Sequence, residues 1–86
     1  MRHILVKLQP FVYNQSIEIY SEKNNLLETH FSSLGVLDIA VLDLCKKQGI
    51  NEIDIRGPID FAKKMQQRIL GTNNKFEKLD LKINLV

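Results

Sequence analysis

The ten residues from Gly49 to Pro58 constrain the fold of this 86-residue chain more than any other segment. Gly49 is the residue type that ends a helix in the left-handed conformation. Ile53 and Ile55 alternate with charged residues, which is the period of a strand with one buried face. Gly57-Pro58 predicts the start of a helix, because a proline at the first helical position loses no hydrogen bond. A helix, strand and helix joined so tightly predict parallel pairing in an α/β sheet.

Hydrophobic periodicity predicts seven elements in the order β-β-β-α-β-α-β. The strands are expected at residues 3–8, 15–22, 26–31, 53–56 and 76–85. The helices are expected at 34–48 and 58–70, the second ending at Gly71 with a turn at 72–74. Right-handed crossovers then give a two-layer α/β sandwich: a five-stranded mixed sheet in the order 3-2-1-4-5, with two helices on one face. We expect a single domain over residues 1–86.

The apolar positions of these elements define a predicted core. Its members are Val6, Ile17, Ile19, Leu37, Val41, Leu44, Ile53, Ile55, Phe61, Met65, Ile69, Leu81 and Ile83. Cys45, the one cysteine, falls on the apolar face of the first helix, which predicts a buried and unreactive thiol.

Composition excludes several classes of protein. The chain is 44% apolar and 26% charged, which is typical of a folded domain rather than a disordered one. Twelve basic and ten acidic residues give a net charge of +2, and no concentrated basic stripe suited to duplex DNA is visible. Neither a signal peptide nor an apolar segment of the ~20 residues needed to span a bilayer is present. We therefore expect a cytoplasmic protein without a membrane partner.

The first strand reads His3-Ile4-Leu5-Val6-Lys7-Leu8, and Gly57 lies near the end of the fourth. The element order resembles the core of the ribonuclease-H-like fold, in which a three-strand meander is followed by helix, strand, helix and strand. That resemblance implies metal-binding carboxylates, beginning with an aspartate on the first strand. This chain has no carboxylate there, has glycine at another acidic position of the family, and could supply at most one ligand from Asp38 or Asp43. The chain also resembles, in its content of Asn, Lys and Ile, short orphan proteins of phages and mobile elements.

The remaining polar residues favour no catalytic or metal site. His3 and His30 fall on different predicted strands without Cys, Asp or Glu at ligand spacing, whereas zinc needs three or four convergent ligands. Glu52 and Asp54 share a strand face, but their expected basic neighbours indicate a solvated surface rather than acid–base chemistry. We expect no enzymatic activity, no cofactor and no metal.

Two surfaces predict a binding role. The last strand carries an apolar row at the sheet edge, without a proline or inward charge to prevent pairing with another strand. The uncovered sheet face is expected to hold interleaved charges, namely Glu18, Tyr20, Glu28, His30, Asp54, Lys78, Asp80 and Lys82. We predict a small non-catalytic module that binds protein or assembles with itself, as a dimer formed by edge-strand or sheet-face contact. The predicted contact residues are Tyr20, Glu28, His30, Lys78, Asp80, Leu81, Lys82 and Ile83.

A single-stranded nucleic-acid-binding protein is the alternative interpretation. Such proteins stack bases on aromatic side chains over a basic sheet. Tyr20 with Lys7, Lys78 and Lys82 would provide that surface here, although one tyrosine among several acids is a sparse version of it.

Overall fold

The computed structural model describes residues 2–86 and contains the seven predicted elements. The strands are β1 (His3–Pro10), β2 (Gln15–Ser21), β3 (Leu26–Ser32), β4 (Glu52–Arg56) and β5 (Lys82–Leu85). The helices are α1 (Leu34–Gln48) and α2 (Ile59–Thr72), and α2 continues into a wider π-helical turn, η1 (Asn73–Glu77). The five strands form one mixed sheet in the order β3-β2-β1-β4-β5, which confirms the predicted topology.

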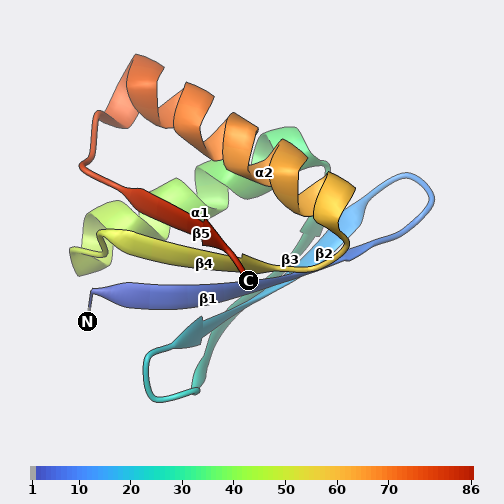
Figure 1. The fold of residues 1–86 in the computed structure, drawn as a ribbon, viewed down its shortest axis with the longest axis horizontal. Helices are drawn as coiled ribbons and strands as arrows, with labels where there is room; N and C mark the ends of the chain where they lie inside the picture. The colour runs from blue at the N-terminus through green and yellow to red at the C-terminus, as the bar shows by residue number, and fades with distance from the viewer. Residues whose placement is uncertain (1) are drawn as a thin grey trace.

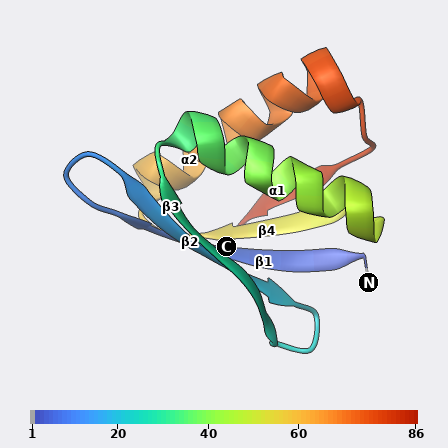
Figure 2. The same ribbon diagram turned by 180° about the vertical axis from the view of Figure 1, so that it is seen from behind.

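Both helices lie on the same face of the sheet and contact each other (Figures 1 and 2). Helix α1 lies on the side of β3, and α2 contacts β1, β4 and β5. The antiparallel meander β1–β2–β3 and the parallel strands β4 and β5 therefore share one helical layer, and the other sheet face stays open. No helix within residues 2–86 has the length and apolar character needed to cross a bilayer.

The core lies between the sheet and the helices. Ten of the thirteen predicted core residues are buried there, and the other three, Phe61, Leu81 and Ile83, are partly buried and pack against it. Gly49 ends α1 with φ of 66°, a left-handed value that favours glycine, and Ile50 folds back with only 3% of its surface exposed. Cys45 is 1% exposed, as predicted.

Gly57 is required by a close approach of two chain segments. A Cβ atom at this position would lie 2.6 Å from the backbone oxygen of Leu8 on β1. The turn between β4 and α2 can pass this close to β1 only because residue 57 has no side chain.

The predicted last strand at 76–85 is wrong in its first six residues. Helix α2 passes through Gly71 instead of ending there, and the chain reverses only at Lys78, whose φ is 54°. Asn73 explains the difference, because its buried side-chain amide both donates to the backbone oxygen of Leu79 (2.8 Å) and accepts from its N–H (2.9 Å). This pair of bonds holds residues 78–81 beneath the helix end, so that β5 retains only four residues.

The predicted orientation of β3 is also wrong. Glu28 and His30 pair with Ile19 and Ile17, and directly paired residues in an antiparallel ladder share a face. Glu28 and His30 therefore lie on the helix-covered side, while Phe31 lies on the open side and is 62% exposed. An apolar-polar alternation could not reveal this, because β3 is an edge strand whose helix-facing positions lie at the margin of the core. Phe31 packs instead against Phe11, with ring centroids 5.5 Å apart.

Candidate functional site

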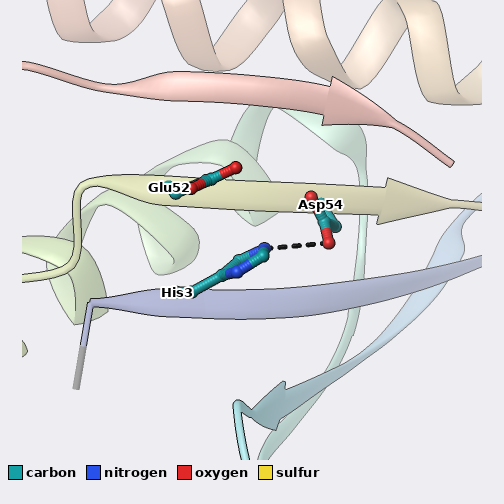
Figure 3. A group of neighbouring side chains, drawn as sticks. All are labelled: His3, Glu52 and Asp54. Carbon is teal, nitrogen blue, oxygen red and sulfur yellow. Dashed lines mark ion pairs between the residues drawn. The ribbon is translucent and has the colours of Figure 1, made fainter.

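Three potential metal ligands meet on the open sheet face, where the central strands β1 and β4 run side by side. The parallel register places His3 opposite Glu52, and Asp54 follows two residues later on the same face of β4. The ligand atoms of these three residues all lie within 4.8 Å of one another. Figure 3 shows His3 reaching from β1 toward β4, where its Nε2 lies 2.8 Å from Oδ2 of Asp54.

Asn84 on the neighbouring strand β5 connects the two carboxylates. Its side-chain Nδ2 donates to Oε2 of Glu52 and to Oδ1 of Asp54, each at 2.8 Å. This amide holds the two acids together and uses one oxygen of each, which leaves the second oxygen of each for another ligand.

The imidazole of His3 is incompletely satisfied. Its Nε2 is buried and makes no hydrogen bond to any group of residues 2–86, although it lies at ion-pair distance from Asp54. The separation is short, but the alignment is not that of a hydrogen bond.

The sequence shows no Asp or Glu at ligand spacing from His3, yet the structure places two acids beside it. The two strands are 49 residues apart in sequence, and only their parallel register brings His3 to Glu52 and Asp54. A signal was present, because β1 and β4 were predicted as neighbours and Asp54 was predicted on the open face. Assigning a face to His3 as well would have placed all three residues on the open face, although the register that brings them together comes only from the paired strands. A basic residue was also expected beside these two acids, and Lys82 of β5 does pair with Glu52.

A second histidine–carboxylate pair lies on the other face at the sheet edge. Nε2 of His30 contacts Oε1 of Glu28 at 2.7 Å. These two residues line a hollow of about 560 Å³ between β3, α1 and η1. Its apolar wall includes Val36, Ile39 and Phe76, which are 52%, 57% and 74% exposed.

The eight predicted contact residues do not form one surface. Tyr20 lies on the open face beneath the Lys7 ammonium, which is 4.7 Å from the ring centroid. Burial and the nearby Glu18 carboxylate raise the pKa of Tyr20. Glu28 and His30 lie on the opposite side at the β3 edge, and the remaining predicted residues lie at the far edge, in or just before β5: Lys78, Asp80, Leu81, Lys82 and Ile83.

Sequence reasoning missed a buried aspartate between the helices. Asp38 of α1 is 1% exposed, and its Oδ2 accepts a hydrogen bond of 2.7 Å from Oγ1 of Thr72. The Arg68 guanidinium lies farther off, with Nε 3.9 Å from the same oxygen. The contacts of Asp38 join α1 to the end of α2, so this carboxylate has a structural role.

The exposed aromatic residues at one end of the open face were also missed. Two aromatic residues of the β1–β2 loop, Phe11 and Tyr13, are 50% and 89% exposed, and Val12 between them is 87% exposed. Phe11 forms an edge-to-face pair with Phe31, at an interplanar angle of 79°. The sequence signal was the run Phe-Val-Tyr directly after a strand-ending proline, which places three large side chains in a loop.

Burial accounts for the chemistry of Cys45. Desolvation raises the pKa of its thiol to about 12, so that the thiolate form is absent at neutral pH. The residue is part of the packed core and offers no nucleophile.

The sequence matches no protein-family model and has no significant match to a curated protein.

Proposed function

We propose that this protein is a small non-catalytic module that assembles with itself, pairing two copies through β3. The observation that carries the proposal is the exposure of apolar side chains on both sides of the β3 edge. On the helix-covered side, Val36 and Ile39 of α1 line the hollow beside β3 and are more than half exposed. On the other side, Leu26 pairs with Tyr20 of the open face and is 53% exposed, and Leu27 next to it is 37% exposed. Exposed apolar side chains gathered at one edge are typical of interaction surfaces.

The backbone of β3 supports pairing at this edge. It is the outermost strand on its side, has seven residues, and contains neither proline nor lysine, which natural edge strands often carry to prevent pairing with another chain. The carboxylate of Glu28, which faces the helix-covered side, is paired with His30 at 2.7 Å. The other edge, β5, was the predicted pairing strand, but it has four residues and its apolar side chains pack against the core.

A two-fold axis beside β3 would cover both the strand edge and the hollow. If the axis is perpendicular to the sheet, the two copies of β3 pair antiparallel and both helical layers lie on the same side. Because α1 contacts β3, the two α1 helices would then face each other across the axis. Their exposed Val36 and Ile39 side chains would be buried, which gives an association driven by apolar area.

The charges at the rim of the hollow suit a second copy of the same surface. The rim carries both basic and acidic side chains, and these are joined in ion pairs: Lys47 with Asp43 at 2.9 Å, Lys46 with Glu77 at 3.2 Å, and His30 with Glu28. A surface with both charges can be complementary to itself across a two-fold axis, whereas a surface with one charge repels its copy.

Light scattering coupled to size-exclusion chromatography tests the proposal. We expect a dimer at about 100 µM protein in both low and high salt, because burial of apolar area is not screened by ions. Ile39→Lys should shift the protein to a monomer by placing a charge at the axis. The matched control is Ile59→Lys, since Ile59 is 56% exposed on α2, away from β3, and this variant should remain dimeric. A monomeric wild-type protein in both buffers contradicts the proposal.

Single-stranded nucleic-acid binding is the second candidate, and the exposed aromatic residues favour it. Phe11 and Phe31 lie near one end of the open face, and Tyr20 with its Lys7 neighbour lies farther along it. Bases could stack on these rings. Binding of labelled single-stranded RNA should then weaken steeply between 50 and 200 mM salt and should be reduced in Phe31→Ser and Lys7→Gln. No shift of the RNA at 50 mM salt rejects this candidate and leaves the self-association result unaffected.

A further inference from the structure

We propose that His3, Glu52 and Asp54 form a binding site for a divalent transition-metal ion on the open face of the sheet. This site is independent of the β3 edge and of the proposed self-association. It combines one imidazole nitrogen with two carboxylates from two adjacent central strands, and all three ligand atoms lie within 4.8 Å.

One separation already matches that of two ligands around one ion. Ligand atoms about 2.1 Å from a metal lie about 3 Å apart when they are adjacent in an octahedron and somewhat more in a tetrahedron. Nε2 of His3 and Oδ2 of Asp54 are already 2.8 Å apart. The ligand oxygen of Glu52 lies within 4.8 Å of both atoms, so its side chain would have to turn toward them to complete the site.

The unsatisfied histidine nitrogen is the second observation that points to a ligand. Nε2 is the atom that would bind the ion, and it is buried without a hydrogen bond in residues 2–86. Buried polar atoms are normally paired, and an unpaired one in a native structure indicates a missing partner. An ion coordinated to Nε2 and Oδ2 would replace a misaligned contact with two bonds.

Asn84 provides the supporting contact that a metal site needs. By donating to one oxygen of each carboxylate, its amide orients both acids toward the same space. Hydrogen bonds to the ligands fix their rotamers, and the loss of such a supporting group typically lowers metal affinity 10- to 100-fold.

The ligand set selects the class of ion. An imidazole nitrogen with two carboxylate oxygens suits Zn²⁺, Co²⁺ or Mn²⁺, whereas Mg²⁺ and Ca²⁺ prefer oxygen ligands alone. The order of intrinsic affinities predicts tighter binding of Zn²⁺ and Co²⁺ than of Mn²⁺. Three protein ligands leave at least one coordination position for water or for a group of a partner on the open face.

The His30–Glu28 pair provides a matched control within the same chain. Its Nε2–Oε1 distance is 2.7 Å, and the two side chains are 36% and 38% exposed, which is close to the 39% of His3. It lacks a third ligand among the groups that could hold an ion within residues 2–86. A histidine beside one carboxylate should bind Zn²⁺ far more weakly than the three-ligand site.

Isothermal titration calorimetry with ZnCl₂, on protein freed of any histidine tag, tests the proposal. We expect one Zn²⁺ per chain, and affinity at least 10-fold weaker in His3→Ala and in Asp54→Asn, with a loss of about 10-fold or more in Asn84→Ala. His30→Ala should bind as the wild-type protein does. Circular dichroism establishes that each variant is folded.

Two further readouts separate a built site from surface adsorption. Co²⁺ should give visible absorption bands of a low-symmetry site that His3→Ala abolishes and His30→Ala keeps. Zn²⁺ at about 100 times its Kd should raise the Tm by at least about 10 °C, since an ion that binds only the folded chain stabilises it. The proposal is overturned if the wild-type protein binds no Zn²⁺ below about 1 mM, or if His3→Ala and His30→Ala weaken binding equally.

Discussion

The two faces of the sheet use the same strands for different purposes, and β4 shows the contrast most directly. On the covered face, Ile53 and Ile55 are 0% and 1% exposed and are packed beneath the helices. On the open face, Glu52 and Asp54 are partly exposed and are joined by Asn84. One strand of five residues therefore supplies both core packing and a gathered polar cluster.

The comparison shows which kind of residue can be read as structural and which as functional. Apolar side chains on the covered face are explained fully by the core that they build. Polar side chains on the open face have no such explanation, because an exposed carboxylate gains little free energy from being held beside another. The convergence of His3, Glu52 and Asp54 is therefore the more informative feature.

Loss of packing on the covered face should have the largest effect on stability. Ile55→Ala should lower the free energy of unfolding by about 2–5 kcal/mol through lost burial and the cavity left behind. Urea denaturation followed by circular dichroism, at one fixed protein concentration, measures this change. A loss below about 1 kcal/mol would mean that the covered face is not close-packed at this position.

Loss of the buried carboxylate above that face should have the next largest effect. Asp38→Ala should cost about 1–3 kcal/mol, because Thr72 loses its buried hydrogen-bond acceptor. The control is Asp43→Ala on the same helix, where the side chain is 57% exposed and forms a surface ion pair with Lys47. That control should change stability by no more than about 0.5 kcal/mol. Equal losses in the two variants would show that Asp38 does not join the helices.

Removal of an acid from the open face should have a small effect. Asp54→Ala should change the free energy of unfolding by at most about 1 kcal/mol, because the side chains of His3 and Asp54 are 39% and 23% exposed and solvent screens their ion pair. The same denaturation assay applies, so that neighbouring positions 54 and 55 are compared directly. A loss as large as that of Ile55→Ala would mean that the open-face cluster is a structural element.

The covered face could be predicted from sequence because burial leaves a repeating signal. Alternation in residues 53–56 and the helical spacing of 34–48 both follow from which side chains face the core. The strand order could then be predicted because connections between parallel strands of one sheet are right-handed. At the edge of the sheet, where fewer side chains are buried, the alternation of apolar and polar residues no longer indicates which face a residue lies on. For this reason the orientation of Glu28, His30 and Phe31 on the edge strand β3 was predicted wrongly.

The C-terminal segment shows a second limit of the sequence pattern. The alternation from Leu79 to Leu85 is real, since Leu79, Leu81, Ile83 and Leu85 all pack against the core. It could not show that Asn73 holds the backbone of Leu79 and shortens the strand, because that contact depends on one side chain at the end of a helix.

The open-face cluster was less predictable than the fold. His3 and Asp54 lie close together because of the register between β1 and β4. Register depends on how two backbones pair, so neither segment alone indicates it. The types of the residues were visible in the sequence, but their meeting point was not.

The smallest expected effect lies at the edge of the open-face cluster and depends on pH. Oε1 of Glu22 accepts hydrogen bonds of 2.8 Å from the backbone N–H groups of Arg2 and His3, and these bonds lower the pKa of Glu22 below its ordinary value of 4.5. A carboxyl group whose pKa is depressed by folding stabilises the folded state above its unfolded pKa, and this contribution is lost as the pH falls through the folded value. Glu22→Gln keeps an acceptor but removes the charge, so its urea midpoint should be slightly below that of the wild-type protein at pH 7. The two midpoints should converge as the pH is lowered from 4.5 toward 3. A difference that stays constant over this range would show that the charge of Glu22 does not hold the start of β1.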